Sequence, residues 1–292
     1  MEKSEIFGFL NIYKPVGMTS HDVVAVLRRI TKIKQIGHTG TLDPFAEGVL
    51  PICIGKATRL IEFLEDDKAY VGKFNFGKST TTYDIEGEEV ETFNQQVTEE
   101  QIKKALKNFE GEIEQFPPIY SAIKVNGKKL YDYAREGKEV EIKSRKVLIK
   151  NIELKDFDYE KQTADIYIKC SKGTYIRSIA HDLGKTLNNG AYLSKLQRVQ
   201  AGRFMIDTSI NLETLNSLTD VEQNLINPID YLPQTKQELN DIELSRVKNG
   251  LPIYNRINAD KGIVMLTKSN NIIGISEVTE TGLKPKKVFL TN

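Results

Sequence analysis

The sequence from Gly37 to Leu60, GHTGTLDPFAEGVLPICIGKATRL, gathers loop-forming glycines, hydroxyl groups and a histidine around one carboxylate, Asp43. Pro44 follows Asp43 directly, and a proline ring disfavours the α-helical region for the residue before it. We therefore expect Asp43 on an extended or turned segment, with its carboxylate projecting from a loop. Taken alone, the tetrapeptide 41–44 is typical of a plain Asp-Pro turn capped by threonines.

The segments around this loop have simple patterns. An amphipathic helix is predicted to begin at Ser20, its expected N-cap, because the apolar residues at 23, 26, 27 and 30 share one helical face. Alternating or continuous apolar residues predict strands, and 3.6-residue periodicity predicts helices. The predicted strands are 8–14, 49–54, 70–76, 147–157 and 163–170, and the further predicted helices are 56–63, 98–109 and 176–187.

Composition argues against several classes of protein. Hydrophobic residues make up 39% and charged residues 28%, and no apolar run approaches the roughly 20 residues that a membrane span needs. Cys53 and Cys170 lack a CxxC spacing, and the 3 histidines lack ligand spacing. We expect a cytoplasmic protein with reduced thiols, no membrane association and no metal site.

The net charge is only +1, but the charges are unevenly distributed. Basic residues predominate in 121–150 and 169–203, whereas acidic residues predominate in 62–91. This pattern suits a phosphate-binding face with an acidic back, although surface lysines that merely solvate hairpins and helices would give the same counts. The sequence GKFNFGKS from Gly72 formally matches a phosphate-binding loop, but its first half reads as strand and no helix is predicted after it.

Several segments closely resemble the motifs of the TruB family, the bacterial tRNA pseudouridine-55 synthases. The resemblance extends from about Gly8 to Arg203. It implies an α+β pseudouridine synthase fold, a mixed and largely antiparallel sheet flanked by helices, with a small C-terminal β-rich domain of the PUA type. The matching segments are YKPVGMTSHDVV (13–24), GHTGTLDPFAEGVLP (37–51), DKAY (67–70), GKSTTTYDIEG (77–87), QFPPIYSAIKVNGKKLYDYAREG (115–137), CSKGTYIRSIAHDLG (170–184) and GAYLSKLQR (190–198).

The resemblance implies roles for individual residues. Asp43 takes the place of the nucleophile, Tyr70 lies against the target uracil, and Arg177 pairs with the catalytic aspartate. Tyr175 lines the pocket. Leu196 packs in it, although from the sequence alone Leu196 is equally a core residue, as is Tyr70.

The resemblance also implies residues that bind the RNA. Lys14 borders the active site, and His38 fills or braces the gap that a displaced base leaves. A basic insertion at about 115–145 grips the RNA backbone, with tyrosines that can stack on bases. Its expected substrate-binding residues are Tyr120, Lys124, Lys128 and Arg135.

Residues 1–233 are expected to form the catalytic domain, and 234–292 the PUA-like RNA-binding domain. The implied activity is isomerisation of a uridine in the T arm of tRNA, with base flipping, no cofactor and no guide RNA, by a monomer. Two alternatives remain: an RNA-binding module without catalysis, and a guide-dependent relative that acts on ribosomal RNA. The Asp43, Tyr70 and Arg177 set favours catalysis, because a pure RNA binder gains nothing from a carboxylate aimed at a polyanion.

Overall fold

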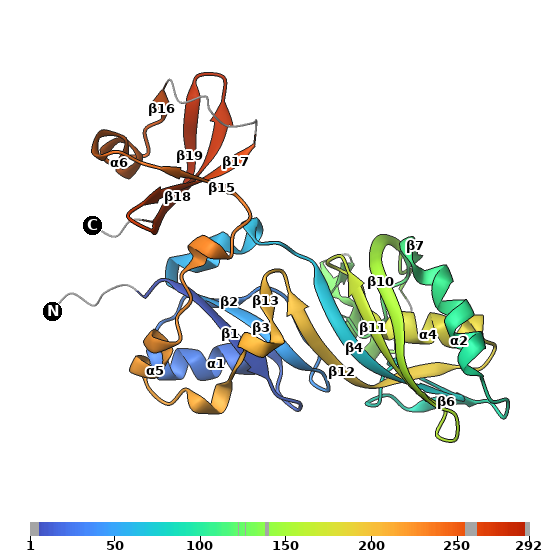
Figure 1. Ribbon diagram of the computed structural model, residues 1–292. Helices are drawn as coiled ribbons and strands as arrows, with labels where there is room; N and C mark the ends of the chain where they lie inside the picture. The colour runs from blue at the N-terminus through green and yellow to red at the C-terminus, as the bar shows by residue number, and fades with distance from the viewer. Residues whose placement is uncertain (1–5, 122, 126, 138–139, 255–261, 290–292) are drawn as a thin grey trace.

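The computed structural model describes residues 6–121, 123–125, 127–137, 140–254 and 262–289. It contains a large sheet, formed by the first part of the chain, and a small sheet formed by its last part (Figure 1). The large sheet is mixed and largely antiparallel, with the order β14-β1-β3-β12-β4-β11-β10-β7, and only β1–β14 and β3–β12 are parallel among these described pairs. The predicted α+β class, with a mixed and largely antiparallel sheet flanked by helices, is confirmed by this arrangement.

The strands of the large sheet are β1 (Gly8–Lys14), β2 (Ile36–His38), β3 (Glu47–Ile54), β4 (Lys68–Phe76), β7 (Gly111–Gln115), β10 (Arg145–Asp158), β11 (Thr163–Cys170), β12 (Ala191–Ala201), β13 (Phe204–Met205) and β14 (Ile210–Asn211). Two short hairpins lie outside it, β5 (Lys78–Thr80) with β6 (Glu89–Thr92) and β8 (Lys124–Val125) with β9 (Lys128–Lys129).

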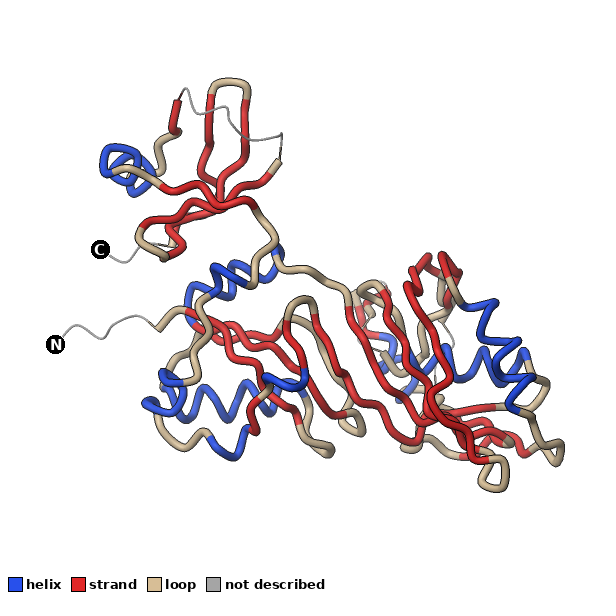
Figure 2. The backbone as a smooth tube through the Cα atoms, in the orientation of Figure 1, coloured by secondary structure: helices blue, strands red, loops and turns tan. Residues whose placement is uncertain are grey.

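Helices lie at both ends of the large sheet (Figure 2). Figure 1 shows α1 and α5 beside β1, and α2 and α4 beside β10 and β11. The helices are α1 (Ser20–Thr31), α2 (Glu99–Leu106), α3 (Leu130–Arg135), α4 (Ile176–Thr186) and α5 (Leu218–Gln223), with the short 3-10 helices η1 (Gly55–Phe63), η2 (Lys107–Phe109), η3 (Ile206–Thr208), η4 (Leu212–Thr214) and η5 (Pro228–Asp230). No helix in the described part of the chain is long and apolar enough to cross a membrane.

Strand β4 buries one of its two faces in a hydrophobic core. Tyr70, Phe74 and Phe76 lie on one face, because alternate residues of a strand point to the same side. This face packs into one hydrophobic core with α2 and α4. The segment after β4 is strand β5 and not a helix, so the formal phosphate-binding loop at Gly72 is rejected, as predicted.

The predicted N-cap of α1, Ser20, was wrong by one residue. Thr19 caps the helix, with its hydroxyl accepting from the backbone N–H of Asp22 at 3.1 Å, while the Asp22 carboxylate accepts from the N–H of Thr19 at 2.8 Å. Ser20 instead hydrogen-bonds both backbone groups of Leu42, at 2.8 and 3.2 Å. Its hydroxyl therefore ties α1 to the loop that carries Asp43.

The small sheet has the order β15-β17-β18-β19-β16. Its elements are β15 (Thr235–Glu238), α6 (Asp241–Lys248), β16 (Ile253–Tyr254), β17 (Ile263–Lys268), β18 (Asn271–Thr279) and β19 (Gly282–Val288). Met265 and Ile275 of this sheet share a core with Phe9 and Cys53 of the large one. Arg59 also donates to the carbonyl of Val288 at 3.1 Å, so side-chain packing and polar contacts both join the two parts.

Gly48 allows β3 and β12 to approach each other. Its φ is +104°, and a Cβ there would lie 2.3 Å from the carbonyl oxygen of Arg198. We expect Gly48→Ala to lower the free energy of unfolding in urea by about 3 kcal/mol or more, since the backbone strain alone costs roughly 1–3 kcal/mol. Gly111→Ala is the control, because Gly111 has φ +90° with open space around it. An equal loss in the two variants would show that crowding against Arg198 does not matter.

Candidate active site

The loop between β2 and β3 holds Asp43 in a fixed position. Besides the two hydrogen bonds between Ser20 and the backbone of Leu42, the carbonyl of Pro44 accepts from the N–H of Gly17 at 2.8 Å. The carbonyl of Asp43 accepts from Ala46 at 3.1 Å, which closes the turn. The Asp43 side chain remains 34% exposed, so the carboxylate projects from a braced turn and can be reached.

Arg177, in the first turn of α4, meets Asp43. Its Nε lies 2.9 Å from Oδ2 of Asp43, and the arginine side chain is only 5% exposed. The contact is an ion pair and not a well-aligned hydrogen bond, because the geometry leaves the Nε–H without an acceptor. A positive charge thus lies directly beside the carboxylate. The predicted proximity of the two residues is confirmed.

Asp84 is a third member of this charge cluster that the sequence interpretation left without a role. Its Oδ2 lies 3.2 Å from Nη1 of Arg177, and its side chain is 4% exposed. Burial raises the pKa of Asp84, while hydrogen bonding to Thr82 and the charge of Arg177 oppose that shift. Arg177 also donates to the carbonyls of Thr82 and Tyr120, both at 3.0 Å. The guanidinium is therefore held from several sides.

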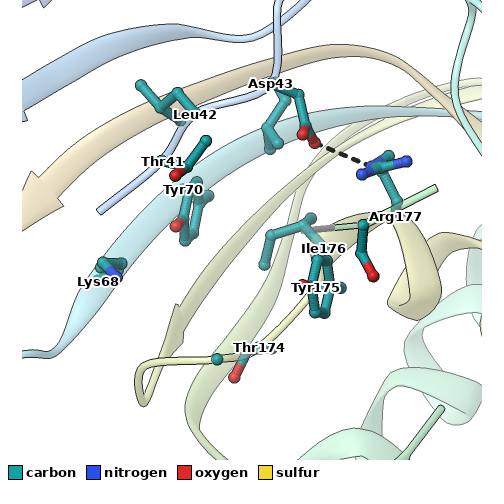
Figure 3. A pocket seen from close by; sticks show the side chains of 12 residues that line it. Thr41, Leu42, Asp43, Lys68, Tyr70, Thr174, Tyr175, Ile176 and Arg177 are labelled. Atoms are coloured by element: carbon teal, nitrogen blue, oxygen red, sulfur yellow. Dashed lines mark ion pairs between the residues drawn. The ribbon is translucent and has the colours of Figure 1, made fainter. Parts of the chain in front are cut away.

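Asp43 and Arg177 line a cavity of about 240 Å³ (Figure 3). Its wall combines the Asp43–Arg177 pair with apolar and aromatic side chains. This volume lies just below the roughly 300–1,000 Å³ of pockets that enclose drug-sized ligands, so it suits part of one nucleotide. The lining residues are Thr41, Leu42, Asp43, Lys68, Tyr70, Ser121, Gly173, Thr174, Tyr175, Ile176, Arg177 and Leu196.

Tyr70, Tyr175 and Leu196 all line this cavity, as the family resemblance led us to expect. Burial raises the pKa of Tyr70 to about 12, so its phenol is protonated at neutral pH and can donate a hydrogen bond. Leu196 is 6% exposed, and it belongs to the hydrophobic core as well as to the cavity wall.

Two buried cations brace the loop from behind. Arg198 is fully buried and donates to the carbonyls of Val49, Thr41 and Gly40 at 2.6, 3.3 and 3.0 Å. The sequence signal for it was its place as the last residue of the family-like segment GAYLSKLQR (190–198). Lys14 was predicted to bind substrate, but it is fully buried and donates to backbone carbonyls, including that of Met18 at 2.6 Å. The structure therefore places Lys14 in the support of the loop and not in the cavity.

Comparison with known proteins identifies the family. The sequence model described as the TruB family pseudouridylate synthase N-terminal domain matches residues 28–176. A tRNA pseudouridine synthase B of Caldanaerobacter subterraneus subsp. tengcongensis is 42% identical over 286 residues, covering 97% of this chain and 99% of the relative. One of Staphylococcus aureus is 42% identical over 303 residues, with the same coverage. The chain belongs to the TruB family.

A solved structure also shares this TruB fold. It is described as the crystal structure of a Cbf5-Nop10-Gar1 complex, and its matching chain has a TM-score of 0.74 at 25% identity, covering 97% of this chain and 85% of that one. A second, described as an H/ACA RNP bound to a substrate RNA containing 2'-deoxyuridine, has a TM-score of 0.73 at 24% identity. The family and the fold together make this chain a pseudouridine synthase.

The insertion of this TruB-family enzyme is anchored to the active site. Besides the bond from Arg177 to the carbonyl of Tyr120, Ser178 donates to the carbonyl of Phe116 at 2.8 Å. Gln115, at the start of the insertion, exchanges two hydrogen bonds with the backbone of Tyr175, at 3.0 and 2.8 Å. The insertion and the cavity wall are therefore one connected structure at this point.

The insertion residues predicted to bind RNA differ in their surroundings. Tyr120 is 37% exposed, whereas Lys128 forms an ion pair with Glu136 and lies over the ring of Tyr133. Lys124 lies in β8 and Arg135 ends α3, but their side chains lie outside the part of the chain that the structure describes.

His38 lies on β2, half-buried, with its ring in edge contact with that of His21 at 5.6 Å between centroids. Its Nδ1 is buried and has no hydrogen-bond partner among the described residues. Burial, followed by the charges of His21, Arg198 and Lys68, lowers the pKa of His38 to about 4. The imidazole is therefore neutral at pH 7.

This shift predicts a pH dependence of stability. Between about pH 6.5 and 4 the unfolded chain binds a proton at His38 and the folded chain does not. The free energy of unfolding therefore falls as the pH falls. We expect His38→Phe to reduce that fall by roughly 1–3 kcal/mol, measured by urea denaturation at pH 7 and pH 4.5. His181, whose pKa is also lowered to about 4, should account for part of what remains. An unchanged pH dependence in His38→Phe would contradict the prediction.

Proposed function

We propose that this enzyme isomerises the uridine at position 55 in the T arm of tRNA to pseudouridine. The observation that carries the proposal is the exposed Asp43 carboxylate, paired with Arg177 at 2.9 Å at the edge of a cavity sized for part of a nucleotide. The relatives that are 42% identical over nearly the whole chain are named tRNA pseudouridine synthase B. The names of these relatives support tRNA as the substrate, and the Asp43–Arg177 pair supports a reaction that begins at a carboxylate.

The reaction breaks the bond between N1 of uracil and C1′ of ribose, turns the base, and joins C5 to C1′. The proton on C5 leaves and N1 gains one, so atoms and electrons balance without an oxidant or a cofactor. A single nucleophile is enough for this exchange. Asp43 takes that role if its oxygen attacks C1′ or C6, and it acts as a base if it removes the proton from C2′; each route begins at this one carboxylate.

The neighbouring residues orient the base and the carboxylate. The ring of Tyr70 stacks against the uracil, while Leu196 and Ile176 provide apolar walls that exclude water. The phenol of Tyr70, protonated at neutral pH, can donate to the turning base. Arg177 keeps a positive charge beside Asp43 throughout the exchange.

The uridine must leave the stacked T arm to reach Asp43, which costs a few kcal/mol. Contacts along the RNA backbone must offset that cost. The insertion at about 115–145, with Tyr120 exposed at its base, provides such contacts, and the neutral ring of His38 can brace the gap in the RNA. Residues 234–292 then serve as a PUA-like domain that holds a further part of the tRNA. The enzyme acts in the cytoplasm as a monomer, without a guide RNA.

The test is to incubate the purified protein alone with an unmodified tRNA transcript and to map pseudouridine in the product. We expect one modified position, uridine 55, and none in a transcript that carries cytidine there. Modification of a bare T-arm hairpin would show that neither a guide RNA nor a partner protein is needed. Binding of the tRNA without any product would support an RNA-binding module and overturn the proposal.

A further inference from the structure

Lys68 is a cavity residue for which no role has been assigned above. It begins β4 two residues before Tyr70, and alternate residues of a strand face the same side, so both point toward the cavity. Figure 3 shows Lys68 on the opposite side of the cavity from Arg177. A ligand that reaches Asp43 and fills the cavity therefore extends toward the Lys68 ammonium.

The other cations at this site are already engaged. Arg177 pairs with Asp43 and Asp84, and the donors of Arg198 and Lys14 are directed at backbone carbonyls. The Lys68 ammonium, in contrast, has no hydrogen bond or ion pair to any residue that the structure describes. It is the cavity-lining cation whose charge the surrounding protein leaves unpaired.

The acidic residues next to Lys68 in sequence do not neutralise it. Asp66 pairs with Lys172 at 2.6 Å, and Asp67 pairs with Lys150. Lysines of the basic segments thus pair with part of the acidic segment 62–91, which therefore does not form a separate acidic face. The two carboxylates next to Lys68 in the sequence are therefore paired with other lysines.

The absence of a side chain at Gly40 leaves room for the Lys68 ammonium. A Cβ at Gly40 would lie 2.9 Å from Nζ of Lys68, so a side chain at that position would displace it. Burial, with the charge of Arg198, lowers the pKa of Lys68 to about 8, which leaves the ammonium mostly protonated at pH 7. A partly desolvated cation interacts more strongly with an anion than a cation in open water does. Lys68 is therefore suited to an anionic partner that comes with the substrate.

We infer that Lys68 binds a phosphate oxygen of the RNA backbone next to the uridine that enters the cavity. The inference rests on the proposed function, since it takes RNA as the substrate. Phosphate is favoured over a uracil carbonyl because it is the charged group that a nucleotide carries, and opposite charges attract each other strongly at a site partly shielded from water. Lys68 thus holds the displaced nucleotide at its phosphate, while Asp43 and Arg177 act at the other side of the cavity.

The test uses single-turnover tritium release from a T-arm hairpin RNA with 5-tritiated uridine, over a range of enzyme and KCl concentrations. Lys68→Met should raise the enzyme concentration for half-maximal rate about tenfold, the loss of one charge-assisted hydrogen bond, and change the maximal rate far less. The slope of log affinity against log salt should decrease by about 0.7–0.9, one phosphate contact. Lys68→Arg, which keeps the charge, should recover most of both. Lys161→Met is the control, because Lys161 is 77% exposed at a distant turn.

A modified RNA makes the test independent of folding in the variant. A hairpin with one neutral methylphosphonate beside the target uridine, placed on its 5′ side or its 3′ side, should bind the unmodified protein about tenfold more weakly at one of the two positions. The affinity of the Lys68→Met protein should be the same for that RNA as for the unmodified hairpin. An unchanged salt slope in Lys68→Met, or equal losses with the modified RNA in both proteins, would overturn the assignment. If the unmodified protein releases no tritium at all, the proposed function itself fails, whatever Lys68 does.

Discussion

Asp43→Asn should reduce pseudouridine formation by roughly 10⁴-fold or more, the scale on which loss of a reacting side chain acts. Asparagine keeps the shape of aspartate but has no negative charge and is a very weak nucleophile. Binding of tRNA should stay within a few fold of the original protein, because the change removes a negative charge next to a polyanion. Tritium release from 5-tritiated uridine in tRNA measures the first effect, and filter binding measures the second.

The control for this prediction is Asp156→Asn on β10, an exposed aspartate far along the sheet from the cavity, which should leave both measurements unchanged. Normal tritium release from Asp43→Asn would refute the assignment of Asp43 as nucleophile. Weak tRNA binding by a folded Asp43→Asn protein would instead show that the carboxylate serves recognition.

Arg177→Met should damage both stability and activity. Arg177 is 4% exposed and its guanidinium serves two carboxylates, Asp43 and Asp84. Its loss leaves Asp84 buried without a counter-charge, and removal of one partner of a buried pair costs about 3–5 kcal/mol. We expect the free energy of unfolding to fall by that amount and turnover to fall at least about 10²-fold, since Asp43 loses the group that positions it.

A double variant separates these two effects. Asp84→Asn combined with Arg177→Met removes the unpaired buried charge, so most of the lost stability should return. Turnover should not return, because Asp43 still lacks its partner. Recovery of full activity together with stability would mean that Arg177 supports the fold only and has no part in the reaction.

Local rules predicted much of the framework from the sequence. Strand β11 was predicted at 163–170, the bounds it has in the structure, because its alternation is unbroken between a turn and a buried cysteine. Helix α2 begins at the predicted capping box of Thr98 and Gln101. These features depend on residues within a few positions of one another, so the order of residues along the chain already contains them.

The position of Asp43 on a loop could also be predicted, because Pro44 restricts the residue before it. The role of Ser20 could not. As a helix cap it was as suitable as Thr19, and only the approach of Leu42 from another segment engages its hydroxyl. Lys14 shows the same limit, since its position near the site was expected but its burial beneath the loop was not.

The sequence by itself thus determined many of the secondary-structure elements, the family and the position of Asp43 on a loop. Tertiary structure alone decided that Asp84 shares Arg177 with Asp43, that Arg198 braces the loop, and that the Lys68 ammonium has no partner among the residues that the structure describes. The physical reason is that the pairing and desolvation of charges depend on segments far apart in the chain meeting in space. A pattern of neighbouring residues carries no information about which of several distant cations a carboxylate will meet.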